Sequence, residues 1–155
     1  MKPMRFIIVL LAIAGLVDSV FALKVHNMDP TQAPPCAVSE QWDCGTVNHS
    51  RFAVFPPRTF DEAPNSKGHI PIAWIGILGY ALIGTLALFG RLWAALHLAE
   101  VGFLCACFLS YLEAFVMEKW CIYCVWSQGL MTAILLFTIL ALMLEHRRSR
   151  KSIFA

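Results

Sequence analysis

The sequence predicts an all-α integral membrane protein, a four-helix bundle with a long outer loop that contains a short surface helix. The 155-residue chain is 59% hydrophobic and only 14% charged, whereas soluble domains average about 45–50% apolar and about 25% charged residues. Four apolar stretches are each long enough to cross a bilayer as a helix. The net charge of +2 does not indicate a nucleic-acid-binding protein. We therefore expect residues 1–155 to form a single membrane domain.

The predicted spans cover residues 6–23, 70–89, 92–117 and 121–144. The second and fourth stretches contain no charged residue, and the third is interrupted by Glu100 and Glu113. The first stretch follows Lys2 and Arg5, a pattern that is also typical of a cleavable signal peptide. Residues 6–23 are therefore either a first span or a leader.

Basic residues flank the spans unevenly, and cytoplasmic loops carry the excess of Lys and Arg. With four spans, one side of the membrane would hold Lys2, Arg5, Arg91, Arg147, Arg148, Arg150 and Lys151. We therefore expect both termini to be cytoplasmic. The loop of residues 24–69 and the turn at residues 117–120 should face the periplasm or an equivalent lumen.

The outer loop, residues 24–69, differs in composition from the spans. It holds six of the eight prolines, together with Cys36 and Cys44. Proline interrupts a helix, but residues 38–55 contain none. This stretch is predicted to form the short helix at the membrane surface.

The fourth span opens with the Cys-x-x-Cys motif of Cys121 and Cys124. A helix N-terminus favours the thiolate, which is the nucleophile in disulfide exchange. At the mouth of an apolar bundle, this pair could reach a lipid-soluble oxidant. The alternatives for the motif alone are a structural disulfide or half of a metal site.

Cys36 and Cys44 would lie on the same side of the membrane as this motif. Four thiols on one side could bind zinc, but the seven residues between Cys36 and Cys44 are unlike the spacing of usual zinc sites. Two dithiols in sequence suit exchange chemistry better, because a thiolate of one pair can attack the disulfide of the other. Cys105 and Cys107, in the middle of the third span, are expected to be packing residues.

In combination these segments resemble the bacterial branch of the vitamin K epoxide reductase family, membrane thiol oxidoreductases built on a four-helix bundle. The resemblance rests on the segments at residues 15–19 with His26, 36–50, 70–76, 111–113 and 121–127. It implies that the first stretch is a retained span. Bacterial members often carry a fused thioredoxin-like domain, whereas this chain ends at Ala155. We therefore expect a separate redox partner.

The resemblance also implies roles for individual residues. Cys121 and Cys124 would be the active-site pair, with Cys124 nearest a quinone. Cys36 and Cys44 would be the shuttle pair, in which Cys44 exchanges with Cys121 and Cys36 meets the protein partner. Ser50 takes the position of a family serine near the active site.

Glu113 matches an acidic position common in bacterial members. An ionisable group within a span is a candidate functional group, and Glu113 could deliver protons to a reduced quinone or simply pair with a polar neighbour. Asp18 and Glu100 lie nearer the ends of their spans, so a functional role is less expected for these two residues than for Glu113.

The predicted function is that of a quinone-dependent thiol oxidoreductase of the bacterial inner membrane. It would reoxidise a periplasmic thioredoxin-fold partner of the DsbA type and pass the electrons through both cysteine pairs to ubiquinone or menaquinone. No metal is expected. One alternative is a reductase of vitamin K epoxide itself, although Gln128 and Pro71 depart from residues of the vertebrate enzymes. The others are a DsbB-type enzyme, which would carry its motif on the first outer loop, a small scaffold subunit with structural disulfides, and a metal-binding protein with four outer thiol ligands.

Overall fold

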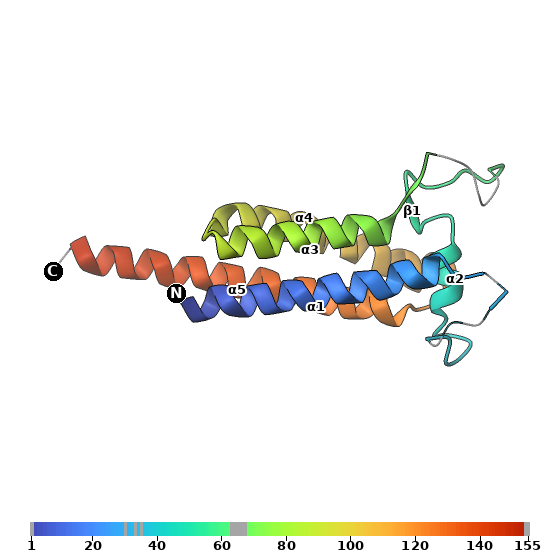
Figure 1. The fold of residues 1–155 in the computed structure, drawn as a ribbon, viewed down its shortest axis with the longest axis horizontal. Coiled ribbons are helices and arrows are strands. Elements are labelled where there is room, and N and C mark those ends of the chain that lie inside the picture. Colours follow the sequence, from blue (N-terminus) through green and yellow to red (C-terminus); the bar gives the residue numbers. More distant parts are fainter. Residues whose placement is uncertain (1, 30, 33, 35, 63–67, 154–155) are drawn as a thin grey trace.

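The protein is a bundle of four long helices capped at one end by an irregular segment, in a computed structural model that describes residues 2–29, 31–32, 34, 36–62 and 68–153 (Figure 1). The long helices are α1 (Lys2–His26), α3 (Ile72–Leu88), α4 (Leu92–Leu112) and α5 (Ile122–Ile153). The predicted all-α membrane bundle is confirmed. The start of α1 and the end of α5 lie at one end of the bundle, and the irregular segment lies at the other.

Three helices are long and apolar enough to cross a membrane, over Pro3–His26, Leu92–Met117 and Ile122–Arg147. The fourth, α3, has 17 residues and rises about 26 Å, slightly less than a hydrocarbon core of about 30 Å. Large apolar side chains such as Leu78, Leu104 and Leu136 are exposed along the bundle. In lipid such a surface faces acyl chains, so it carries no energetic penalty.

Small residues bring α1 and α3 close together. The ring of Tyr80, which is 1% exposed, occupies the space where a side chain on Gly15 would stand. Nearer the other end of these two helices, a Cβ on Gly84 would lie 3.3 Å from that of Ala12. Helices in membranes associate largely through such close backbone contacts. Helix α1 also packs against α5, and α4 packs against α3 and α5.

The outer end contains a single turn of helix, α2 (Cys44–His49), and a two-stranded antiparallel ribbon of β1 (Val54–Phe55) and β2 (Ile70–Pro71). Residues 38–55 were predicted to form one helix, but only six of them do. Asp43 caps the N-terminus of α2 by accepting a hydrogen bond from the Thr46 N–H, and Ser50 ends the helix in an extended conformation. The residues before Asp43 make a turn in which the Val38 N–H donates to the Trp42 carbonyl over 3.1 Å.

Helix α4 continues into a wider π-helical turn, η1 (Glu113–Met117). The turn ends at Glu118, which has a φ of 52°, and the Glu118 and Lys119 segment then reverses the chain towards α5. The π turn follows directly on α4, so the Glu113 side chain lies at the outer end of the bundle and not at mid-membrane.

Replacing Gly15 by alanine tests the α1–α3 contact. The added methyl group would collide with the Tyr80 ring, and overpacking of this kind costs about 1–3 kcal/mol. The thermal midpoint in detergent should therefore fall by several degrees. Gly129→Ala is the control, because nothing lies within 4 Å of its added methyl group. Equal midpoints for the two variants would show that Tyr80 does not require this glycine.

Candidate active site

A short backbone pairing holds the outer loop against the start of α5. Trp42 and Trp120 form an isolated parallel β-bridge. In it, the Asp43 N–H donates to the Trp120 carbonyl over 3.0 Å, and the Trp120 N–H donates to the Gln41 carbonyl over 2.7 Å. The Lys119 ammonium group adds a hydrogen bond to the Glu40 carbonyl. Because Cys44 and Cys121 each follow a bridge residue closely, this pairing brings the two cysteine pairs together.

The first pair, Cys36 and Cys44, forms a disulfide with its Cα atoms 5.7 Å apart. Cys44 is the first residue of α2 and is completely buried, and Cys36 is 5% exposed. Cys36 is therefore slightly more accessible than Cys44, although both are buried.

The second pair, Cys121 and Cys124, is not joined by a disulfide in this structure. Cys121 comes immediately before α5 and is completely buried, whereas Cys124 lies in the first turn of α5 and is partly buried. The two side chains share a hydrogen bond. Cys36, Cys44 and Cys121 belong to one buried cluster, and Cys124 packs against it. The structure thus brings together the four cysteines singled out in the sequence.

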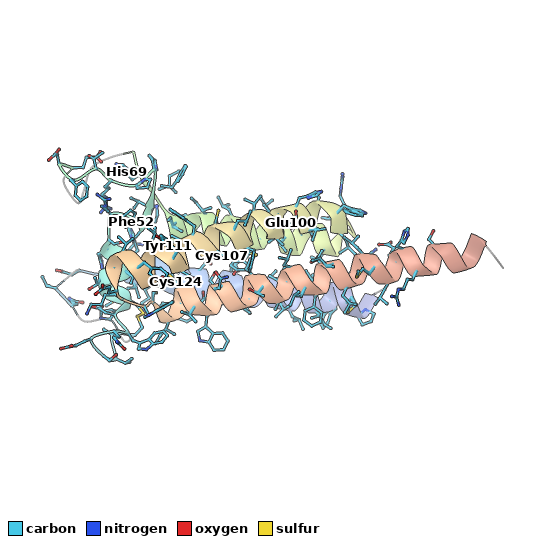
Figure 2. All side chains as sticks on the ribbon, turned by 180° about the vertical axis from the view of Figure 1, so that it is seen from behind. Phe52, His69, Glu100, Cys107, Tyr111 and Cys124 are labelled. Atoms are coloured by element: carbon cyan, nitrogen blue, oxygen red, sulfur yellow. A yellow bond between two sulfur atoms is a disulfide. The ribbon has the colours of Figure 1, made fainter. Side chains whose placement is uncertain are left out.

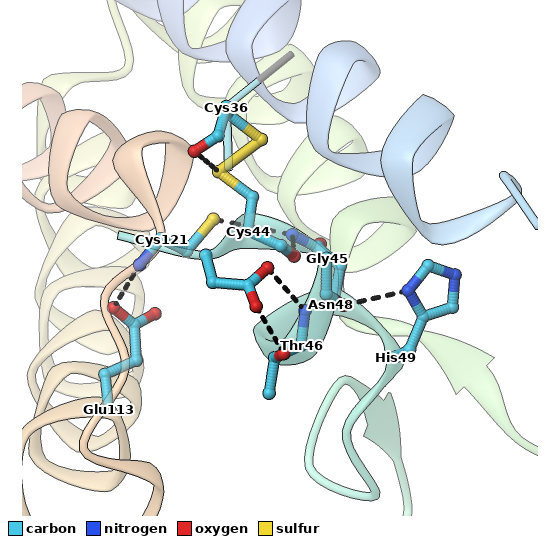
Figure 3. The surroundings of a disulfide bond; sticks show 9 residues. Cys36, Cys44, Gly45, Thr46, Asn48, His49, Glu113 and Cys121 are labelled. Atoms are coloured by element: carbon cyan, nitrogen blue, oxygen red, sulfur yellow. Dashed lines mark hydrogen bonds between the residues drawn. A yellow bond between two sulfur atoms is a disulfide. The ribbon is translucent and has the colours of Figure 1, made fainter. Parts of the chain in front are cut away.

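Asn48 connects the two pairs and was missed in the sequence (Figure 3). Its side-chain amide donates to the Cys44 carbonyl over 2.9 Å and lies 3.4 Å from the Cys121 sulfur. Asn48 stands one helical turn after Cys44 on the same face of α2. That spacing would have been a signal only if the bounds of α2 had been known.

Asp43 orders the start of α2, which carries both Cys44 and Asn48. Its carboxylate accepts hydrogen bonds from the Thr46 hydroxyl and the Thr46 N–H. The bond from the Thr46 side chain is the main cause that lowers the pKa of Asp43, against a smaller opposing effect of burial. The resulting stabilisation is present above the unfolded-state pKa of about 3.9 and is lost as the pH falls through the lower folded-state pKa.

Glu113 binds the start of α5 directly. Its Oε2 accepts a hydrogen bond from the Cys121 N–H over 3.1 Å, its side chain also contacts that of Cys124, and it is 1% exposed. The sequence predicted a functional acid about two turns below the mouth of the bundle. The structure places its carboxyl group directly beside Cys121 and Cys124.

A cavity of about 240 Å³ opens beneath the cysteines, between the four long helices. Cys124, Glu113 and Ser50 are among the residues that line it. The Ser50 hydroxyl oxygen is buried, with no hydrogen-bond partner among the residues that the structure describes. Cys124, at the outer end of the bundle (Figure 2), is thus the cysteine of the second pair that faces this cavity.

The remaining lining is mostly apolar. It comes from all four long helices and from the segment after α2, and includes Ala22, Phe52, Ile72, Ile75, Ile83, Leu98, Val101, Leu109 and Met131. A flat, apolar ring with a few polar atoms fits such a wall better than a charged ligand does.

The two mid-span cysteines differ from each other. Cys105 lines the cavity, whereas Cys107 accepts a hydrogen bond from the Gln128 side chain over 3.3 Å. Neither lies in the buried cluster of outer cysteines.

The histidines of the outer end hold the backbone. His26 Nδ1 bonds the Asn48 carbonyl over 2.5 Å, and His49 bonds the carbonyls of Gly45 and Met28. Within the described ranges, no three His, Cys, Asp or Glu side chains are grouped so that they could hold a metal ion.

The model of the vitamin K epoxide reductase family matches residues 6–139. No curated protein matches the chain.

Replacing Asn48 by leucine tests its contact with the Cys121 sulfur. Hydrogen bonds to charged groups are worth about 1.5–3 kcal/mol, so loss of the N–H donor should raise the pH at which Cys121 forms its thiolate by about one unit. The measurement is the rate of Cys121 alkylation against pH, in reduced protein whose other outer cysteines are replaced by alanine.

Asn27→Leu is the matched control, because Asn27 is exposed at the end of α1 and its side chain touches no cysteine. If Asn48 only supports the α2 backbone through the Cys44 carbonyl, N48L would lower the thermal midpoint and leave the alkylation profile unchanged. That result would overturn the assignment.

Proposed function

The chain belongs to the vitamin K epoxide reductase family, which implies a membrane thiol oxidoreductase that uses quinones, and we propose that this member reoxidises a periplasmic thioredoxin-fold protein of the DsbA type. The electrons pass through both cysteine pairs to a quinone, ubiquinone or menaquinone. The observation that carries the proposal is the arrangement of the four cysteines, with three in one buried cluster and Cys124 in the wall of the cavity.

The enzyme lies in the bacterial inner membrane with both termini in the cytoplasm. The excess of Lys and Arg at the end that holds the start of α1 and the end of α5 supports this orientation. The cysteines then face the periplasm, a compartment in which disulfides persist.

The first exchange occurs at the outer pair. A thiolate of the reduced partner attacks Cys36 and releases Cys44, and the second thiol of the partner then frees Cys36. The partner leaves with a new disulfide, and its two electrons now reside on the thiols of Cys36 and Cys44. The slight exposure of Cys36 and the complete burial of Cys44 support this order of attack.

The second exchange occurs inside the buried cluster. The Cys44 thiolate attacks Cys121 of an oxidised Cys121–Cys124 pair and releases Cys124. Cys36 then attacks Cys44, which re-forms the Cys36–Cys44 disulfide and frees Cys121. The Asn48 amide, within reach of the Cys121 sulfur, stabilises this sulfur when it leaves as a thiolate.

The cavity fits a quinone by its volume, its apolar wall and its few polar atoms. When bound, a quinone is a two-electron oxidant. In the net reaction, two S–H bonds of Cys121 and Cys124 break, one S–S bond forms, and two electrons and two protons reach the two carbonyl oxygens. Glu113 moves a proton between the Cys124 thiol and the nearer oxygen, and the unpartnered Ser50 hydroxyl orients that oxygen.

The direction follows from redox potentials. Partners of the DsbA type have potentials near −120 mV, so their reoxidation needs a strong electron acceptor such as a quinone. A metal-binding role for the four thiols is less well supported, because the disulfide between Cys36 and Cys44 removes two of the four ligands.

The test is quinone reduction by the full chain in lipid nanodiscs, with a reduced DsbA-type protein as donor and a short-chain para-quinone as acceptor. We expect sustained turnover in the wild type and a fall to the uncatalysed rate in Cys124→Ala. Cys107→Ala should keep at least half of the wild-type rate, because Cys107 lies outside the cavity lining. Wild-type protein that reduces vitamin K epoxide but no simple quinone, or Cys124→Ala that turns over normally, would overturn the proposal.

A further inference from the structure

The cavity contains a second polar region, deeper than the cysteines. Tyr80 of α3 reaches across the bundle to α5, where its hydroxyl lies 3.0 Å from the Ser127 carbonyl and 2.8 Å from the Ser127 hydroxyl. Ser127 follows Cys124 by three residues on α5, a helical rise of about 4.5 Å, so this region lies a little less than one turn deeper than Cys124. Asp18 of α1 lines the same cavity and lies in the neighbourhood of Tyr80.

Asp18 is the polar group of this region that is free to bind a ligand. The Tyr80 hydroxyl has one proton, which is shared with Ser127. No side chain or backbone N–H among the described residues forms a hydrogen bond or an ion pair with Asp18. Of the two polar side chains, Tyr80 is therefore satisfied and Asp18 is not.

The position of Asp18 makes this free carboxyl group unusual. Asp18 is the single charged residue among residues 6–23 of the sequence. Placing an ionisable group within a membrane-spanning helix costs free energy. Glu100, another acid within a span, is exposed outside the cavity lining and bonds His97 over 3.1 Å. Packing alone would be served better by an apolar residue at position 18, so the cost indicates a ligand contact.

The two polar regions match the shape of one class of ligand. Glu113, Ser50 and Cys124 form the outer region, and Asp18 forms the inner one. A para-quinone has its two carbonyl oxygens on opposite sides of the ring, so the two oxygens can meet polar groups at two different places in the cavity wall. In an ortho-quinone the oxygens are adjacent, so one ring cannot reach both regions.

We propose that Asp18 forms a hydrogen bond with the quinone oxygen that faces away from Cys124, and that this contact makes the cavity selective for para-quinones. The inference rests on the proposed function, since it takes the quinone to be bound in this cavity. Asp18 is a binding residue that donates to the carbonyl oxygen or accepts from the hydroxyl of the quinol. It adds no proton to the net reaction.

The test measures binding apart from turnover. The reduced full chain in nanodiscs is treated with a maleimide under anaerobic conditions, and alkylation of Cys124 is followed by mass spectrometry. A para-quinol, or the ortho isomer with the same tail, is added as a protecting ligand that the reduced enzyme cannot reduce further. We expect the wild type to be half protected at a concentration of para-quinol at least tenfold below that of the ortho isomer.

The variants then assign the selectivity. Asp18→Leu should reduce the tenfold preference to less than twofold, whereas Asp18→Asn, which keeps a donor and an acceptor, should retain most of it. Glu100→Leu, the matched acid outside the cavity lining, should retain it fully. An unchanged preference in Asp18→Leu would overturn the role of Asp18 alone. A wild type that neither isomer protects would instead overturn quinone binding in the cavity, and with it the proposed function.

Discussion

The arrangement of the outer end depends on the pairing of Trp42 with Trp120. This single parallel bridge joins the loop that follows α1 to the turn that precedes α5, segments that are far apart in the sequence. Together with the Asn48 side chain, it holds Cys44 near Cys121. Helix α2 needs such support because it has only six residues, and isolated helices of that length are unstable in water. Exchange requires a thiolate to contact a disulfide sulfur directly, so the proposed relay through the four cysteines depends on this bridge.

The bundle beneath this junction separates two kinds of chemistry. Above, Cys36, Cys44 and Cys121 belong to a buried cluster, which is where we propose that thiol exchange takes place. Below, the cavity presents Cys124 and two polar regions to an apolar ligand. One part of the cavity wall is formed where Tyr80 packs against Gly15 of α1 and reaches across the bundle to Ser127 of α5. Residues 15 and 80, which carry no chemistry of their own, thus set the shape of the site.

The sequence predicts the membrane bundle and the two cysteine pairs well, since both depend on local signals: hydrophobic runs, the Cys121–Cys124 spacing and the proline-rich loop. It predicts much less of what surrounds the cysteines. The extent of α2 is set by the cap at Asp43, and the contact of Asn48 with Cys121 arises only after the loop has folded over α5. Asp18 lies near the end of its predicted span and so gave little reason for interest, because its place in the cavity wall depends on the packing of α1 against α3.

The most direct measurement of the relay is disulfide mapping in two double variants. Cys36→Ala with Cys124→Ala leaves Cys44 and Cys121 of the outer cysteines, and Cys44→Ala with Cys124→Ala leaves Cys36 and Cys121. Electron transfer through Cys44 predicts that mild oxidation in lipid links Cys44 to Cys121 rapidly, and that Cys36 and Cys121 link at least tenfold more slowly. Equal rates for the two variants, or no link between Cys44 and Cys121, would contradict it.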